Sequence, residues 1–214
     1  MIDMNKKIVA IGGAVIKTAL DELKTVIKRG QVEMLIHNGG SIFHDFQRST
    51  NFLKSHSYPI DELLKDHSCN ERSSNDVWNW IDGDFAPKNS VTWLCEDLGI
   101  PVLLFTGQAC DFWQLYGNEN DWRDAAGKSF LDFKTLINRF KTPFHYVCMG
   151  SAVIHPEVFL KAVAEAKPKD FRADVVDFLD MYRPRTRVAK YGKYYKMTHK
   201  EYLEKWIKRI QKKR

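Results

Sequence analysis

The sequence predicts an α/β fold in which a parallel sheet is covered by helices on both faces. Two observations predict it. Short, continuously apolar segments alternate along the chain with segments whose apolar residues recur at helical spacing. A glycine turn follows each apolar segment, at Gly12, Gly39, Gly107 and Gly150. Strands buried on both faces are typical of parallel sheets, in which a helix connects one strand to the next.

Size and composition favour one domain with an appendage. The chain has 214 residues, of which 44% are hydrophobic, and this is enough for one sizeable core. No apolar run approaches the ~18 residues that a membrane-spanning helix needs. The apolar stretch at residues 8–11 is too short for a signal peptide. We therefore expect a cytoplasmic protein that does not bind membranes.

The spacing of cysteine and histidine argues against a metal centre. The seven histidines are scattered, with no i,i+4 pair on a convincing helix. No two of the four cysteines are close enough to form a C-x-x-C pair; they are Cys69, Cys95, Cys110 and Cys148. We expect no metal ion, and reduced thiols that are mostly buried.

Two strand–turn–helix units make up the first part of the chain. The predicted strands are residues 7–11 and 32–36, and the predicted helices are residues 16–29 and 42–53. The glycine-containing run His37 to Ser41 is predicted to be the turn that leads into the second helix. Residues 55–88 are polar, and we expect a long excursion there with one short helix near residues 60–65.

Two further units follow this excursion. The predicted helices are residues 89–98, 129–140 and 156–166, and the predicted strands are residues 101–105 and 144–149. Asn89 and Ser90 can cap the first of these helices. Ser129 and Asp132 form a capping-box pattern that predicts the start of the second. Pro156 suits the first position of the third.

The C-terminal residues 181–214 are strongly basic. They hold 13 Lys or Arg and 2 Glu, a net charge of +11, whereas the rest of the chain carries −5. We therefore divide the chain into a domain at residues 1–180 and a basic arm at residues 181–214. Within the arm, Thr198 and Glu201 form a capping box that opens an amphipathic helix.

Such an arm can bind nucleic acid or an acidic partner through residues 183–214. Its tyrosines alternate with lysines, which fits base stacking and fits oligomer packing equally well; they are Tyr191, Tyr194, Tyr195 and Tyr202. The charge is also compatible with a solvated tail, or with a segment that packs on a neighbouring subunit.

The glycine turns carry the strongest hint of a ligand. In His37 to Ser41, two glycines stand beside a hydroxyl where a strand ends and a helix begins, and Gly150-Ser151-Ala152 repeats that arrangement. Backbone N–H groups at such turns can bind phosphate, and the pair would suit a pyrophosphate. Alternatively, glycine simply makes a tight turn. A P-loop is excluded because Trp122 stands where Gly127-Lys128-Ser129 requires a glycine, and Gly12-Gly13 lacks the G-x-G-x-x-G spacing.

Three segments resemble the deoxyhypusine synthase family. They are residues 8–46, which include the pair His44-Asp45, residues 89–105 and residues 144–158. The resemblance implies a Rossmann-like, NAD-binding domain that assembles as a homotetramer. It also implies that NAD takes a hydride from a polyamine and that an aminobutyl group passes to a lysine through imines.

One departure from the family bears directly on the reaction. His155 stands where the family has its reactive lysine, and an imidazole cannot form the same imine. We therefore expect a divergent protein that binds NAD or a related nucleotide and catalyses a different transfer or redox step. A non-catalytic oligomeric binding protein that uses its basic arm, and a purely structural subunit, are the alternatives.

The candidate site follows from the turns and the resemblance. The expected cofactor-binding residues are Gly12, Gly13, Asn38, Gly39, Gly40, Ser41, Thr106, Gly107, Gly150 and Ser151. The candidate acid–base residues are His155, His44 and Asp45, because a histidine near neutral pKa suits proton transfer. Each of the three can instead be structural; for His155 the two roles are equally favoured, and for Asp45 a role at a helix start is favoured over catalysis.

Overall fold

The computed structural model describes residues 6–49, 71–106 and 119–212 and contains one six-stranded sheet. All strand pairs are parallel, and the order is β3-β2-β1-β4-β5-β6. The strands are β1 (Lys7–Ile11), β2 (Val32–Asn38), β3 (Val102–Phe105), β4 (Phe144–Met149), β5 (Phe171–Asp177) and β6 (Tyr194–Lys196). The predicted parallel α/β fold is therefore confirmed, and two strands, β5 and β6, are added to the four predicted.

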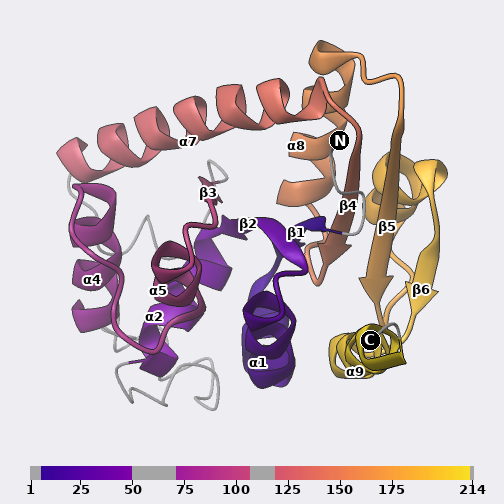
Figure 1. Cartoon of the computed structure of the whole chain (residues 1–214). Coiled ribbons are helices and arrows are strands. Elements are labelled where there is room, and N and C mark those ends of the chain that lie inside the picture. The colour runs from indigo at the N-terminus through magenta and orange to yellow at the C-terminus, as the bar shows by residue number, and fades with distance from the viewer. Residues whose placement is uncertain (1–5, 50–70, 107–118, 213–214) are drawn as a thin grey trace, which may run out of the picture.

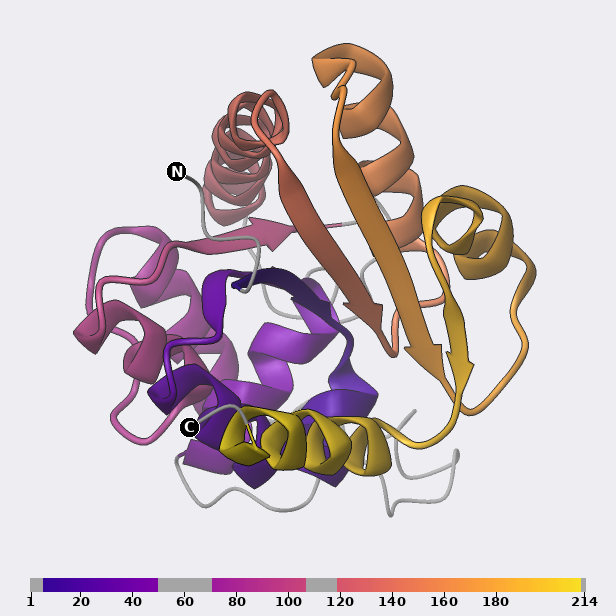
Figure 2. The same cartoon turned by 45° about the vertical axis from the view of Figure 1, so that its right-hand side comes forward.

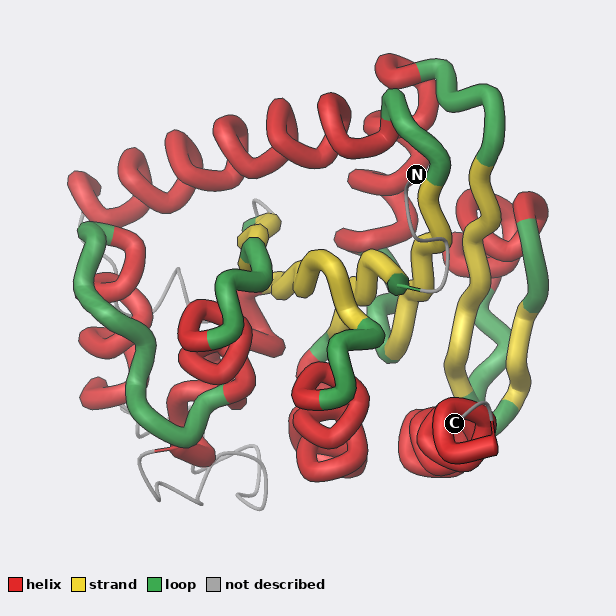
Figure 3. Tube along the Cα trace, in the orientation of Figure 1, coloured by secondary structure: helices red, strands yellow, loops and turns green. Residues whose placement is uncertain are grey.

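Helices cover both faces of the sheet (Figures 1 and 3). The helices are α1 (Gly13–Lys28), α2 (Gly39–Ser49), α4 (Glu71–Ile81), α5 (Val91–Asp97), α7 (Glu119–Phe140), α8 (Ile154–Ala166) and α9 (His199–Lys212). Alternate side chains of each strand point to opposite faces. On β1, Val9 and Ile11 pack with α1, α5 and α9, whereas Ile8 and Ala10 pack with α7 and α8.

A third apolar cluster joins α2 and α4 to the β3 side of the molecule. It includes Phe46, Val77 and Trp80, with Leu104 of β3 beneath them. Helix α4 was not predicted, and the short helix expected near residues 60–65 lies outside the described residues. β2 runs directly into α2, because Gly39 and Gly40 form the first residues of the helix rather than a separate turn.

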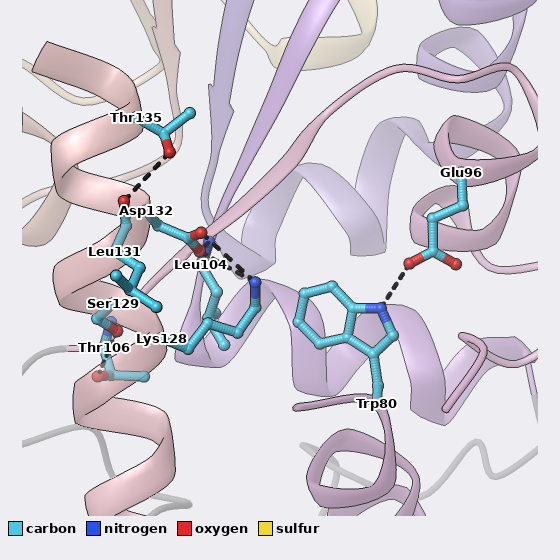
Figure 4. Close-up of polar contacts among 9 residues, drawn as sticks. All are labelled: Trp80, Glu96, Leu104, Thr106, Lys128, Ser129, Leu131, Asp132 and Thr135. Carbon is cyan, nitrogen blue, oxygen red and sulfur yellow. Dashed lines mark hydrogen bonds and ion pairs between the residues drawn. The ribbon is translucent and has the colours of Figure 1, made fainter. Parts of the chain in front are cut away.

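The predicted start of α7 at Ser129 is wrong. The helix begins at Glu119, so Ser129 and Asp132 lie inside it. Their side chains bond instead to β3, whose outer edge has no neighbouring strand among the described residues. Asp132 accepts from the Leu104 N–H at 2.7 Å, and Ser129 accepts from the Thr106 N–H at 3.2 Å (Figure 4). The polar spacing that resembles a cap therefore provides acceptors for backbone N–H groups at the unpaired edge of β3 and just beyond its end.

Two predicted caps are confirmed. The Ser90 hydroxyl accepts from the Trp93 N–H at 2.8 Å and opens α5. In α9, the Thr198 N–H donates to the Glu201 carboxylate at 3.0 Å, and the Glu201 N–H donates to the Thr198 hydroxyl at 3.2 Å. Pro156 lies in the first turn of α8, as its third residue.

The basic C-terminal segment packs against its own chain. β6 pairs with β5, and α9 lies along α1 (Figure 2). Tyr202, Leu203 and Trp206 of α9 are buried in the core, and the Tyr195 ring lies 5.1 Å from that of Tyr202. These aromatic side chains therefore serve packing within the fold. None of the described helices is long and apolar enough to cross a membrane.

Candidate functional site

The turns that follow β1 and β4 meet at the carboxyl edge of the sheet. These strands are neighbours at the point where the strand order reverses, which is where ligands bind in open α/β sheets. The Gly12 N–H donates to the Met149 carbonyl at 2.8 Å. A Cβ atom on Gly12 would overlap the carbonyl oxygen of Gly150, which itself has a φ of 64°. Glycine is therefore required at both positions for the two turns to approach.

Helix α1 begins at this meeting point without a side-chain cap. Gly12 is its N-cap residue and offers no side chain to the first N–H groups. A Cβ atom on Gly13 would lie 2.7 Å from the His44 ring, so Gly13 allows α1 and α2 to pack closely. His44 is buried, with its Nδ1 3.1 Å from the Gln47 side-chain oxygen. The candidate His44 thus lies beside the glycine turn.

The turn after β2 is held by its own polar groups. The Asn38 side chain accepts from the Ser41 N–H at 2.8 Å, and the Ser41 hydroxyl accepts from the Asn38 N–H at 2.9 Å. His37, which was not a candidate, lies 2.9 Å from the same hydroxyl. In classical dinucleotide-binding domains a carboxylate in this region binds the ribose. In this chain Asn38, at the end of β2, has a neutral amide in place of that carboxylate.

Asp45 is bonded to the start of α5. Its carboxylate accepts from the Val91 N–H at 2.7 Å and from the Thr92 N–H at 2.9 Å. The Thr92 hydroxyl donates to it as well, at 2.7 Å. Burial raises the pKa of the Asp45 carboxyl, and these hydrogen bonds oppose that shift. The contacts give Asp45 a structural role at a helix N-terminus, where a negative charge is favourable.

His155 reaches from α8 to the end of β1. Its Nε2 lies 2.9 Å from the Ile11 carbonyl oxygen, so Nε2 carries the proton and donates. Its Nδ1 is buried and has no hydrogen-bond partner among the described residues. Burial lowers the pKa of His155 to about 4, which keeps the ring neutral at physiological pH. A neutral ring nitrogen without a partner in the described chain thus lies buried at the switch point of the sheet.

His199 is a further residue of this edge, and it was not among the predicted site residues. It is the first residue of α9 and is buried. Its Nε2 has no partner within the described part of the chain and would lie 3.0 Å from a Cβ atom on Gly150. Burial lowers the pKa of His199. Only the position of α9 in the folded chain brings His199 to the β4 turn, and no local sequence signal indicates it.

Arg48 supports the first turns of α1. At Ala19 the backbone of α1 leaves the helical region, with φ −150°. The Arg48 guanidinium donates to the carbonyl oxygens of Ile16 and Lys17, at 2.8 and 3.0 Å. These carbonyl groups precede the kink, and Arg48 gives them hydrogen-bond donors. Arg48 therefore helps to hold the first turns of α1 in place at the carboxyl edge of the sheet. No motif in the sequence indicates this role.

The remaining predicted ligand-binding turn follows β3 at the carboxyl edge of the sheet (Figure 4). The Thr106 hydroxyl lies 3.0 Å from that of Ser129, whereas Gly107 lies outside the described residues. The ammonium of Lys128 is 3.2 Å from the Asp132 carboxylate and 4.8 Å from the centre of the Trp80 ring. Ser151, the remaining candidate, is buried and accepts from the His155 N–H at 3.3 Å.

Strand order and the switch point between β1 and β4 define a Rossmann-like α/β domain. No family model matches the sequence, and no curated protein matches it either. Solved structures share the fold, at low sequence identity. Unliganded AgrE aligns with a TM-score of 0.64 and 15% identity over 99% of this chain and 31% of AgrE.

Two other solved structures share this fold. A putative LOR/SDH protein from Methanococcus maripaludis S2 aligns with a TM-score of 0.62 and 15% identity, over 97% of this chain and 63% of that one. ArgZ, an arginine dihydrolase from the ornithine–ammonia cycle in cyanobacteria, aligns with a TM-score of 0.60 and 16% identity, over 98% of this chain and 30% of ArgZ. The chain therefore spans less than a third of ArgZ and AgrE, and the likeness establishes the fold.

Proposed function

We propose that this domain binds NAD or a related dinucleotide at the carboxyl edge of its sheet. One observation carries the proposal: the Gly12 and Gly150 turns meet at the switch point, where α1 begins without a side-chain cap. Free N–H groups and the helix dipole at that position favour a pyrophosphate. A structural neighbour supports it, since AgrE has been solved in a ternary complex with ornithine and NAD+.

The reaction proposed for the site is a transfer or redox step other than deoxyhypusine formation. His155 occupies the place of the family's reactive lysine, and its imidazole cannot form the imine that the family's chemistry requires. Its Nδ1 is buried and unpartnered within the described residues, so its proposed role as a hydrogen-bond or proton acceptor requires the edge to open when substrate binds. Kinship with the deoxyhypusine synthases, a polyamine substrate and a homotetramer belong to the same proposal.

A carboxylate at the start of α1 tests the binding site. Ala14 lies in the first turn of α1 and is partly exposed. Ala14→Glu would place a negative charge where the pyrophosphate is proposed to bind, while the helix dipole tolerates that charge. We expect calorimetry to show NAD binding for the wild type and the neutral control Ala14→Gln, and none for Ala14→Glu. Equal binding by all three proteins would place the dinucleotide elsewhere.

A second candidate function is the binding of an acidic partner or nucleic acid by the outer face of α9. Lys200 is 3.5 Å from the Glu22 carboxylate. In the described part of the chain, no ion pair joins the four exposed cations of the last turns to an acidic side chain; they are Lys205, Lys208, Arg209 and Lys212. Deleting the segment would remove β6 and part of the core, so charge reversal is the cleaner test. Lys205→Glu with Lys208→Glu should abolish salt-sensitive binding, and absence of such binding in the wild type rejects this function.

A further inference from the structure

His199 places a buried polar atom without a partner at the carboxyl edge of the sheet. The residue is 2% exposed, and its Nε2 has no hydrogen-bond partner within the described part of the chain. Buried polar groups are nearly always hydrogen-bonded, because an unsatisfied one costs free energy. The atom therefore indicates a partner that comes from outside the chain.

The position of this atom links it to the proposed dinucleotide site. A Cβ atom on Gly150 would lie 3.0 Å from the His199 Nε2 and 3.3 Å from Cγ2 of Val15, the third residue of α1. The carbonyl oxygen of Gly150 is also the atom that a Cβ on Gly12 would overlap. The start of α1, the β4 turn and His199 therefore meet at one corner of the carboxyl edge.

The His199 ring is held in place by its own surroundings. It is the first residue of α9, which begins at the capping box of Thr198 and Glu201. The ring of Phe178, just after β5, meets it edge-on with 6.2 Å between the ring centres. Burial lowers the pKa of His199, so the ring is neutral and can carry its proton on Nε2. In that form Nε2 is a fixed hydrogen-bond donor.

A ligand reaches this donor when the turn after β4, residues 150–153, moves outward from the His199 ring. The Gly150 N–H lies 3.3 Å from the Val176 carbonyl, which is longer than the usual backbone hydrogen bond of about 2.9–3.0 Å. Ala152 and Val153 of the turn are exposed to solvent. A short outward movement of the turn therefore uncovers Nε2 and leaves the strands in place.

We infer that His199 is a binding residue of the dinucleotide site, and that its Nε2 donates a hydrogen bond to the pyrophosphate. The inference rests on the proposed function, because it needs a phosphate group at the Gly12 and Gly150 turns. It adds a side chain from the C-terminal segment to a site that the glycine turns form from backbone N–H groups. The ligand then satisfies the atom that the folded chain leaves without a partner.

Calorimetric titration of the full chain with NAD and with ADP, which share a pyrophosphate, tests the inference. His199→Leu keeps most of the side-chain volume and removes the donor, and we expect it to weaken both ligands at least about tenfold. His199→Gln can place an amide N–H near the position of Nε2 and should restore most of the affinity. Tyr202→Phe is the control, because it removes a polar atom from the buried face of α9 one turn further along, and it should bind as the wild type does.

Urea unfolding of the same proteins separates ligand binding from packing. Because His199→Leu removes an unsatisfied buried atom, its free energy of unfolding should equal or exceed that of the wild type. A residue that only packs the core would show the opposite result, a loss of stability together with the loss of affinity.

The outcomes distinguish this inference from the proposed function. If the wild type binds both ligands and His199→Leu binds them equally well, the inference is overturned and the dinucleotide site stands. A loss of affinity for NAD but not for ADP also overturns it, because the contact would then not be to the pyrophosphate. So does an equal loss of affinity and stability in His199→Leu and His199→Gln. A folded wild type that binds neither ligand overturns both the inference and the proposed function.

Discussion

His155 ties the end of β1 to the start of α8, with its Nε2 2.9 Å from the carbonyl oxygen of Ile11. The bond crosses the switch point from one turn to the other and leaves Nδ1 as the unused basic atom. One imidazole thus fixes the geometry of the edge, and its buried Nδ1 is the atom that we propose as a proton acceptor there. The two functions can be separated by substitution.

The His155→Gln variant should keep the fold and lose turnover. A glutamine amide can donate to Ile11 as Nε2 does, but it has no basic nitrogen. We expect His155→Gln to unfold within about 1 kcal/mol of the wild type in urea, and His155→Ala to lose about 2–4 kcal/mol through the lost contact and the cavity. Dinucleotide binding by His155→Gln should match the wild type. If the variant keeps full turnover of an identified substrate, His155 is not an acid–base residue.

Stability should fall as the solution is acidified below about pH 6.5. Burial lowers the pKa of His155 to about 4 and that of His37 to about 3, from an ordinary value of 6.5. At a pH between the ordinary pKa of 6.5 and the lowered pKa of the folded protein, each histidine is protonated in the unfolded chain and neutral in the folded chain. Each histidine therefore removes up to about 1.4 kcal/mol per pH unit as the pH falls through this window, and the full stability is present above pH 6.5.

Urea unfolding at a series of pH values from neutral to mildly acidic measures that slope. The His155→Gln variant lacks one titrating group and should show a shallower dependence. A slope that is the same in both proteins would mean that His155 is protonated as readily in the folded chain as in the unfolded one.

Replacing Asp45 should destabilise the helix that it caps. In Asp45→Ala the N–H groups of Val91 and Thr92 lose their acceptor inside the core, which costs about 1–3 kcal/mol for each unsatisfied group. Thermal melting should show a clear decrease, and NAD binding measured well below the transition should remain. A neutral effect on melting would show that the contact does not stabilise α5.

The outer edge of β3 should depend on Asp132. Asp132→Ala leaves the Leu104 N–H without its acceptor and removes the ion pair with Lys128. We expect a loss of about 2 kcal/mol and looser packing of α7 on β3, which favours aggregation through the unpaired strand edge. Exposed Lys134 is a matched site on the same helix, and Lys134→Ala should leave unfolding and light scattering unchanged. An Asp132→Ala protein that melts and scatters as the wild type does would contradict this role.

Features of the fold and the site that depend on residues close together in the sequence could be predicted, whereas those that depend on contacts between distant segments could not. Four strands, their parallel arrangement and the caps at Ser90 and Thr198 follow from local periodicity and capping chemistry, and the structure confirms them. Strands β5 and β6 were missed. Arg172 and Asp174 interrupt the apolar run of β5, and both bond to other side chains, since Asp174 accepts from His145 and Arg172. β6 has only three residues.

Long-range contacts account for the remaining differences. Ser129 and Asp132 have the spacing of a cap, but β3 lies beside them, and a strand edge in need of acceptors is not visible in a local pattern. His199 reaches Gly150 only because α9 folds back along α1. Of the candidate site, the Gly12 and Gly150 turns and His155 are brought together at the switch point, whereas Asp45 is bonded to α5.

Calorimetric titration of the full chain with NAD is the most direct test of a dinucleotide site between the Gly12 and Gly150 turns. We predict saturable binding at one site per chain, lost in Ala14→Glu and kept in Ala14→Gln and His155→Gln. Absence of binding by a folded wild type, or binding that Ala14→Glu leaves unchanged, would contradict a site at that position.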